Sequence, residues 1–239
     1  IAQLTKDGNE LAAYLCNRLH KDKIILLGHS WGSILGVHMV RDRPDLFYAY
    51  VGTGQLVSEQ KDAIAGYPLL VARARAQGNK QAEKELLAAG PPPYPDDIRA
   101  WLPLELWAQA LDPAPPQQPP PSPGQLWLMM RDFFKPDGLS SMITPAVQFS
   151  MISLWPEIVK DDLPSLGLKF DVPVVFIQGA EDITTSTAVA KDYFDQIEAP
   201  SKQFITLPHV GHLAVFRDRG RFLRALEEDV HPLALANGG

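Results

Sequence analysis

Residues 28–32 read Gly-His-Ser-Trp-Gly and directly follow the apolar run at residues 24–27. A G-x-S-x-G pattern with a strand in front and an apolar helix behind is typical of a sharp strand-to-helix turn. Glycine at positions 28 and 32 removes side chains that would collide as the backbone doubles back. The new helix would direct its amide N–H groups and the positive end of its dipole at a reacting carbonyl oxygen. Ser30 is therefore a candidate nucleophile held in an exposed position.

Strand-like and helix-like segments alternate around this turn and again toward the end of the chain. Apolar runs predict four buried strands, over residues 23–27, 47–52, 174–178 and 203–207. A helix capped by Asn9 is predicted before the first strand. Its apolar face would consist of Leu11, Tyr14, Leu15 and Leu19. Strands that alternate with helices predict an α/β fold with a mainly parallel sheet covered on both sides.

The stretch from residue 56 to residue 165 interrupts that alternation. It predicts helices near residues 58–76, 79–89, 97–110, 125–134 and 146–159. Twelve of the 22 prolines lie between positions 91 and 123, which favours loops and polyproline segments there. We therefore predict a helical, proline-rich cap over residues 56–165, inserted into a core made of residues 1–55 and 166–239. Residues 113–123 are interpreted as a stiff connector within the cap, with a ligand for an SH3-type partner as the alternative.

The predicted cap is also rich in large aromatic side chains. They are Trp101, Trp107, Trp127, Phe133, Phe134 and Trp155. Most are expected to form the core of the cap. An aromatic insert above a nucleophile would also suit an apolar acyl or side-chain pocket.

Composition narrows the range of partners. The 239 residues fit one large α/β domain or a domain with an inserted cap. A net charge of −6 argues against nucleic-acid binding, which requires clustered Lys and Arg. The single cysteine, Cys16, allows no intrachain disulfide and is expected to be packed. No apolar run approaches the roughly 20 residues of a membrane span, so no membrane partner and a cytoplasmic location are expected.

A serine nucleophile needs a base to take its proton and an acid to orient that base. Two carboxylates, Glu181 and Asp182, follow the third predicted strand. A carboxylate at the C-terminal end of a parallel strand would lie on the same edge of the sheet as Ser30. We predict Asp182 as the acid, with Glu181 as a competitor and helix capping as the alternative role of Asp182.

Two histidines, His209 and His212, follow the fourth predicted strand. His212 comes after a glycine and opens the last helical region, a loop position that can lean over the edge of the sheet. We predict His212 as the base and His209 as a neighbouring loop residue. The sequence has no cluster with metal-ligand spacing and no glycine-rich phosphate loop, so neither a metal nor a nucleotide cofactor is expected.

The chain resembles the α/β-hydrolase superfamily, and within it the prolyl aminopeptidase (proline iminopeptidase) branch. The resemblance rests on the serine–acid–histidine order, the Gly-His-Ser-Trp-Gly-Ser turn, the strand at residues 46–52 and the Gly-Ala-Glu-Asp loop at residues 179–182. It extends through most of residues 9–55 and 165–229.

The resemblance implies roles for four residues. Ser30 would be the nucleophile, His212 the general base and Asp182 its orienting acid. The backbone N–H of Trp31 would supply one donor to the oxyanion. Relatives that open epoxides or remove halide carry aspartate at the nucleophile position. Serine at position 30 therefore implies acyl transfer from esters, thioesters or peptides.

One feature of the family is absent from the sequence. Family members have strands ahead of the helix that leads into the nucleophile strand, together with a His-Gly-Gly-Pro-Gly or similar loop that provides a second oxyanion N–H. This chain opens at that helix, so a truncated α/β-hydrolase fold is expected. Losing one oxyanion donor costs about 10²–10³ in rate. An activated ester tolerates that loss better than an amide.

The missing strands would also leave an exposed apolar edge along residues 23–27, which is a hazard for aggregation. Three explanations are open: the sequence is a fragment of a longer gene product, the cap folds back over the edge, or a second copy covers it. We predict a homodimer. Size-exclusion chromatography with light scattering at micromolar concentration tests this prediction.

Three functions from different classes remain open. The leading hypothesis is a serine hydrolase that cleaves small to medium carboxylic esters through an acyl-enzyme. A prolyl aminopeptidase acting on short peptides would in addition need an acidic cap residue to hold a free α-amino group. The candidates are Glu59, Glu83, Glu105 and Glu157. The third hypothesis is a binding or scaffold protein that keeps the serine turn without efficient catalysis.

Overall fold

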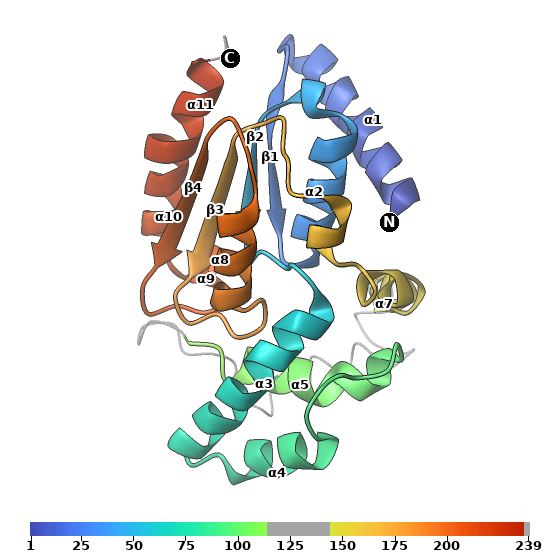
Figure 1. The fold of residues 1–239 in the computed structure, drawn as a ribbon, viewed down its shortest axis with the longest axis vertical. Coiled ribbons are helices and arrows are strands. Elements are labelled where there is room, and N and C mark those ends of the chain that lie inside the picture. Colours follow the sequence, from blue (N-terminus) through green and yellow to red (C-terminus); the bar gives the residue numbers. More distant parts are fainter. Residues whose placement is uncertain (114–143, 237–239) are drawn as a thin grey trace.

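The computed structural model describes residues 1–113 and 144–236. Its four strands form one parallel sheet in the order β1-β2-β3-β4 (Figure 1). The strands are β1 (Ile24–His29), β2 (Phe47–Thr53), β3 (Val174–Gly179) and β4 (Lys202–Leu207). Each predicted strand is present with its ends within two residues of the expected bounds. The predicted α/β class and its parallel sheet are confirmed.

Helices precede, separate and follow these strands. The α-helices are α1 (Ala2–Leu19), α2 (Trp31–Asp42), α3 (Glu59–Ala76), α4 (Lys80–Ala89), α5 (Ile98–Ala110), α7 (Thr144–Ile158), α8 (Thr187–Gln196), α9 (Ala214–Arg217), α10 (Arg219–Ala225) and α11 (His231–Leu235). Short 3₁₀ turns cover Pro44–Leu46 and Leu163–Leu166, and a π-helical turn covers Leu226–Val230.

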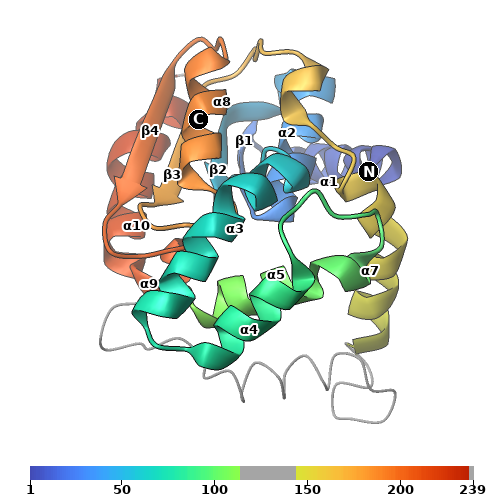
Figure 2. The same ribbon diagram turned by 60° about the horizontal axis from the view of Figure 1, so that its bottom comes forward.

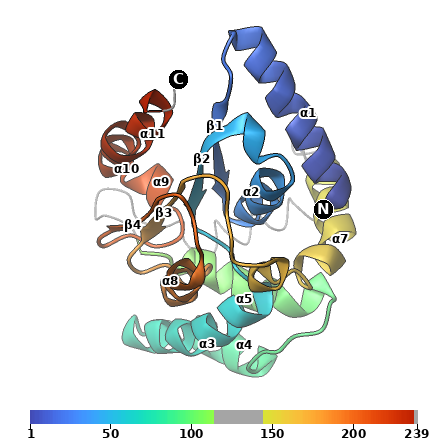
Figure 3. The same cartoon turned by 45° about the horizontal axis from the view of Figure 1, so that its top comes forward.

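The two central strands are buried along their whole length, which explains why their sequences are continuous apolar runs. Helices α1, α2 and α8 contribute to the hydrophobic cluster on one face of the sheet. Helix α10 and the turn after it contribute to the cluster on the other face. Figure 3 shows α1 and α2 on one side of the strands and α10 and α11 on the other. Because all four strands pair in parallel, their C-terminal ends lie along one edge of the sheet.

The first helix differs from its prediction in both its start and its packed face. It begins at Ala2, so Asn9 lies inside it, buried, and donates from Nδ2 to Asp42 Oδ2 at 2.9 Å. The buried positions of α1 include the small residues Ala12 and Cys16, which allow close approach to α2. Of the four residues of the predicted apolar face, Leu15 is half-buried and the other three are exposed. Those exposed side chains are Leu11, Tyr14 and Leu19.

Helices α3, α4 and α5 lie between β2 and β3 in the chain and share a hydrophobic cluster of their own. Leu70, Leu86 and Trp101 are fully buried within it. Figure 2 shows these three helices together beside the sheet. The division into a core and a cap at residues 56 and 165 stays a prediction.

Part of the predicted cap lies outside the described residues. This part includes the predicted helix at residues 125–134, the connector at 113–123 except for Pro113, and Trp127, Phe133 and Phe134. The predicted helix at residues 146–159 corresponds to α7. In the parts of the chain that the structure describes, no helix is long and apolar enough to cross a membrane.

Strand β1 pairs with β2 on one side, and within residues 1–113 and 144–236 no strand pairs with its other side. Leu27 on this strand is 43% exposed. Closure of this edge by a second copy of the chain stays a prediction, for which light scattering is the test.

The entry into α3 contains a buried carboxylate that affects stability. Asp62 Oδ2 accepts the backbone N–H groups of Val57 and Ser58 at 3.2 and 3.3 Å, while Oδ1 has no partner among the described residues. Burial raises the pKa of Asp62 to about 8, partly offset by these N–H donors. The neutral acid therefore persists in the folded protein at pH 7.

We expect Asp62→Asn to stabilise the protein increasingly as pH rises from about 4 to about 8. Over that range the unfolded chain ionises at Asp62 while the folded chain stays neutral, so the parent loses stability with rising pH. Asparagine removes this titration. The gain in melting temperature should reach about 2–4 °C or more at pH 8, equivalent to about 1 kcal/mol. Asp45→Asn, at an exposed position paired with Arg43, should give no such gain. If the melting temperatures of Asp62→Asn and the parent differ by the same amount at pH 5 and at pH 8, the prediction is contradicted.

Candidate active site

Ser30 occupies the turn between β1 and α2, with φ 57° and ψ −133°. A positive φ is uncommon for a residue other than glycine, and it indicates a strained backbone of the kind found at functional turns. The backbone N–H of Ser30 donates to Thr53 O at 3.0 Å, and its carbonyl accepts from Ser33 Oγ at 2.5 Å. The predicted strand-to-helix turn is present, and these bonds hold it from both sides.

The two glycines of the turn differ in importance. A Cβ on Gly28 would lie 2.5 Å from the carbonyl oxygen of Gly32, so position 28 requires glycine. A Cβ on Gly32 would meet nothing within 4 Å. The expectation that glycine at position 32 avoids a collision is therefore wrong.

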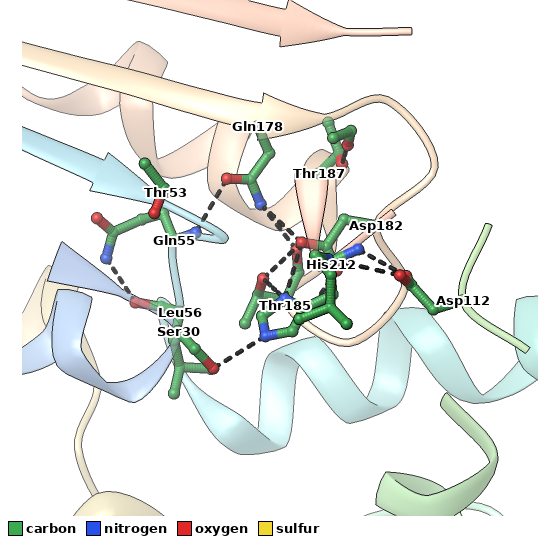
Figure 4. A network of polar contacts seen from close by, with 12 residues as sticks. Ser30, Thr53, Gln55, Leu56, Asp112, Gln178, Asp182, Thr185, Thr187 and His212 are labelled. Carbon is green, nitrogen blue, oxygen red and sulfur yellow. Dashed lines mark hydrogen bonds and ion pairs between the residues drawn. The ribbon is translucent and has the colours of Figure 1, made fainter. Parts of the chain in front are cut away.

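A hydrogen-bonded path connects Ser30 to the loops after β3 and β4 (Figure 4). His212 Nε2 lies 3.0 Å from Ser30 Oγ, and His212 Nδ1 lies 3.1 Å from Asp182 Oδ2. His212 is 7% exposed and Asp182 is 4% exposed. Because Nδ1 faces a carboxylate, the neutral ring carries its proton there, and Nε2 is left to accept from the serine hydroxyl. The three residues singled out from the sequence are thus in contact.

Two residues that sequence reasoning missed hold Asp182 in place. Thr185 donates from its backbone N–H to Oδ1 at 3.0 Å and from Oγ1 to Oδ2 at 2.8 Å. Thr185 Oγ1 also lies 3.1 Å from His212 Nδ1, so the ring N–H is shared between the hydroxyl and the carboxylate. Gln178 donates from Nε2 to Asp182 Oδ2 at 3.4 Å and to Thr185 O at 2.9 Å. A glutamine within the apolar strand 174–179 was the available signal for this support.

Gln178 also connects the loop after β3 to the loop after β2. Its Oε1 accepts the backbone N–H of Gln55 at 2.9 Å. Gln55 in turn accepts the Tyr50 hydroxyl at 2.7 Å and donates to Leu56 O at 2.8 Å. These polar groups are buried and paired, which rigidifies the edge of the sheet beneath the site.

The groups around His212 shift the pKa of its ring. Burial of the ring is the largest single effect and opposes its charged form. The charge and hydrogen bond of Asp182 and the charges of two further carboxyl groups together outweigh burial, so the pKa of His212 is raised above its usual value of 6.5. The two further groups are Asp112 and Glu105. The site therefore stabilises an imidazolium, which is the form a base adopts after accepting a proton.

His29 packs against this ring. The two imidazoles stack with centroids 5.0 Å apart, and Phe216 contacts His29 edge-on at 5.5 Å. Burial, and then the charge of His212, lower the pKa of His29 to about 4. His29 Nδ1 lies 3.0 Å from Thr53 Oγ1. His29 is thus a neutral neighbour that orients the His212 ring.

The competing residues from the sequence lie away from this path. Glu181 Oε2 is 3.7 Å from Arg73 Nη2, and Glu181 Oε1 is 4.0 Å from His209 Nδ1. The side chain of His209 is 89% exposed. Trp31 is the first residue of α2, where a backbone N–H has no intrahelical acceptor and can serve as an oxyanion donor. Among the described residues, no group of three or more His, Cys, Asp or Glu side chains is arranged to hold a metal ion.

Two of the four candidate cap glutamates lie close together near the site. Glu59 and Glu105 line a small cavity of about 10 Å³ between α3, α5 and the loop after β3. Burial, followed by Glu105 and Asp62, raises the pKa of Glu59 well above its usual range. Burial also raises the pKa of Glu105, and this effect is opposed by His212. By contrast, Glu83 pairs with Arg75 and Lys80, and Glu157 contacts the backbone nitrogen of Ile1.

A parallel sheet with a serine, a histidine and a carboxylate in contact at its C-terminal edge defines a class of hydrolase folds. The chain matches the alpha/beta hydrolase family over residues 3–225. It belongs to that family.

Among curated proteins, the chain is similar to the probable aminopeptidase YbaC of Bacillus subtilis, with 27% identity over 229 residues, which are 95% of this chain and 71% of the relative. Among solved structures, it is similar to VinJ (16% identity, TM-score 0.56, covering 94% of this chain and 71% of that one). It is also similar to a proline iminopeptidase of Mycobacterium smegmatis, with 17% identity and a TM-score of 0.53, covering 93% of this chain and 70% of that one. A thermophilic esterase is similar at 18% identity and a TM-score of 0.53, covering 94% of this chain and 73% of that one. These structures support the fold, and the family match confirms the predicted resemblance to the α/β-hydrolase superfamily.

Proposed function

We propose that the protein is a serine hydrolase that cleaves small to medium carboxylic esters through an acyl-enzyme. The observation that carries the proposal is the 3.0 Å contact between Ser30 Oγ and His212 Nε2, continued to Asp182. In this proposal Ser30 is the nucleophile, His212 the general base and Asp182 the acid that orients it.

The reaction would proceed in two halves. Ser30 Oγ attacks the ester carbonyl carbon while its proton passes to His212 Nε2, and Asp182 stabilises the imidazolium. The Trp31 N–H donates to the oxyanion. His212 then returns the proton to the departing alkoxide, which leaves as the alcohol. A water molecule, deprotonated by His212, attacks the acyl-enzyme and releases the carboxylic acid and a free Ser30.

Esters are proposed ahead of amides because an alkoxide leaves the tetrahedral intermediate more readily than an amine. An ester therefore requires less stabilisation of the oxyanion. The test compares hydrolysis of p-nitrophenyl butyrate with that of proline β-naphthylamide. A higher kcat/KM for the butyrate supports the proposal. Absence of ester hydrolysis together with absence of labelling by a fluorophosphonate probe would overturn it and favour a binding or scaffold role.

One observation favours aminopeptidase activity as a second candidate. A peptide with a free α-amino group carries a positive charge. Glu59 and Glu105 are half-buried carboxyl groups that line one small cavity, and Glu105 interacts electrostatically with His212. A bound ammonium would compensate for their burial and allow both to ionise. The similarity to a probable aminopeptidase points in the same direction.

If that second candidate is correct, Glu105→Gln should lower kcat/KM for proline β-naphthylamide by about tenfold or more, because a hydrogen bond to a charged group is lost. Hydrolysis of p-nitrophenyl butyrate should change much less. That substrate has no ammonium, and the change affects it only through a lower pKa of His212. Glu83→Gln, which alters a glutamate paired on the surface of α4, is the control. Equal losses on both substrates would show that Glu105 does not recognise the amine.

A further inference from the structure

We propose that Asp112 is a positioning residue, through which the end of α5 holds the loop that carries His212. Asp112 lies two residues after the last residue of α5, Ala110, and 100 positions before His212 in the chain. The catalytic part of this inference rests on the proposed function. The structural part concerns the His212 loop alone.

The contact is short and direct (Figure 4). Asp112 Oδ1 accepts the backbone N–H of His212 at 2.6 Å, and Oδ2 lies 3.5 Å from the N–H of Leu213. Asp112 is 3% exposed. A carboxylate that accepts consecutive backbone N–H groups in a buried position forms charge-assisted hydrogen bonds, which fix backbone orientation more firmly than neutral ones. The peptide unit that precedes the His212 side chain is thus held by the insert between β2 and β3.

Asp112 has cationic neighbours. Arg217 of α9 lies with Nη2 3.8 Å from Asp112 Oδ2, and its Nη1 donates to Asp112 O at 3.4 Å. The side chain of Arg217 is only 8% exposed. Burial raises the pKa of Asp112, whereas the His212 N–H and Arg217 oppose that rise. Arg217 therefore favours the charged acceptor that the His212 loop requires.

The loop that carries His212 leaves space for the Asp112 carboxylate at Gly211. A Cβ on Gly211 would collide with Asp112 Oδ1, so the approach of Asp112 requires glycine at position 211. The N–H of Gly211 donates to Pro113 O at 3.3 Å. The glycine that precedes the predicted base thus has a steric role in this contact.

The same end of α5 is joined to the loop that carries Asp182. Arg73 of α3 donates from Nη1 to Leu111 O at 3.3 Å and from Nη2 to Glu181 O at 3.4 Å. Asp112 therefore contacts the His212 loop directly, and Leu111 is connected to the Asp182 loop through Arg73. A displacement of α5 would move the base and its acid together, which couples the position of the inserted helices to the geometry at Ser30.

Several charged or titratable groups act on His212. Asp182, Asp112 and Glu105 favour its charged form, while burial disfavours it, and the stacked imidazole of His29 is kept neutral. Arg217 pairs with Asp112, and Arg73 interacts electrostatically with Asp112. Removing the charge of Asp112 should therefore lower the pKa of His212, whereas a purely structural contact would leave that pKa unchanged.

The experiment compares Asp112→Asn and Asp112→Ala with Asp97→Asn in the full chain. Asp97 caps the other end of α5 by accepting the N–H of Arg99 at 3.0 Å, and its replacement by Asn keeps a cap. The titration of the His212 ring is followed by NMR, with the resonance assigned by its absence in His212→Gln. The pH profile of kcat/KM for p-nitrophenyl butyrate is recorded in parallel.

We expect the NMR midpoint of His212 to fall by about half a unit or more in Asp112→Asn and to stay unchanged in Asp97→Asn. Asparagine keeps an oxygen acceptor, so its kcat should fall by only a few-fold. Asp112→Ala should lower kcat by about 10- to 100-fold, with KM little changed, because the base is misplaced. An unchanged midpoint and a normal kcat in folded Asp112→Asn and Asp112→Ala would overturn the inference. The NMR titration needs no turnover, so it tests the effect of Asp112 on His212 even if the parent hydrolyses neither substrate.

Discussion

Replacing Ser30 with alanine is expected to lower kcat/KM for p-nitrophenyl butyrate by at least about 10³-fold, and up to about 10⁶-fold. The change deletes one oxygen, the atom that would form the covalent bond to the acyl group. The His212 ring keeps its contacts with Asp182 and Thr185, so the rest of the site is retained. Steady-state kinetics on the purified variant, with circular dichroism to confirm folding, measure the effect.

Labelling by a fluorophosphonate probe gives a second readout, because it reports the nucleophile without turnover. Ser30→Ala should lose labelling altogether. Ser165→Ala is the matched control, since the Ser165 hydroxyl is exposed and donates to Asp162 O in a 3₁₀ turn. Retention of more than about a tenth of the parent activity in Ser30→Ala would refute the role of Ser30, because removal of a nucleophile costs far more.

The sheet was predictable from the sequence because each of its strands carries a local pattern. Strands β2 and β3 are buried on both faces, so they read as continuous apolar runs that need no knowledge of distant residues. Helix α2 was equally clear, since a buried helix is apolar on almost every side. In these elements the local sequence and the tertiary environment agree.

The first helix shows where such patterns mislead. Its apolar stripe predicted a packed face, yet the structure packs α1 against α2 through smaller side chains. A Cβ on Gly8 would lie 2.7 Å from Met39 Sδ, so the absence of a side chain at position 8 leaves room for Met39 of α2. The choice of packed face depends on the partner helix, and periodicity within one helix cannot reveal it.

The residues of the site also divide into those that the sequence could predict and those that it could not. Ser30, Asp182 and His212 could be selected because each follows a recognisable strand. Thr185 and Asp112 could not, because their roles depend on side chains that meet only after folding. Asp112 is the clearer case, since it lies in the proline-rich insert, far from either loop in sequence, and no motif surrounds it.

Asp182→Asn is expected to lower kcat for p-nitrophenyl butyrate by about 10⁴-fold while leaving KM close to that of the parent. Asparagine can present an N–H to His212 Nδ1, which then accepts, and the ring proton moves to Nε2. In that tautomer Nε2 no longer accepts the proton of Ser30. The variant also lacks the negative charge that raises the pKa of His212, so its residual activity should appear at lower pH than in the parent.

Glu181→Gln is the natural control, because Glu181 precedes Asp182 directly and competes for the same role in sequence. Its side chain is 45% exposed and faces Arg73 and His209 rather than His212. We expect its kcat to stay within about twofold of the parent, as for a surface pair worth at most about 1 kcal/mol. A loss in Glu181→Gln as large as that in Asp182→Asn would assign the acid to the neighbouring position. Full activity in Asp182→Asn would remove the acid from the proposed mechanism, since His212 would then need no carboxylate to hold its proton on Nδ1.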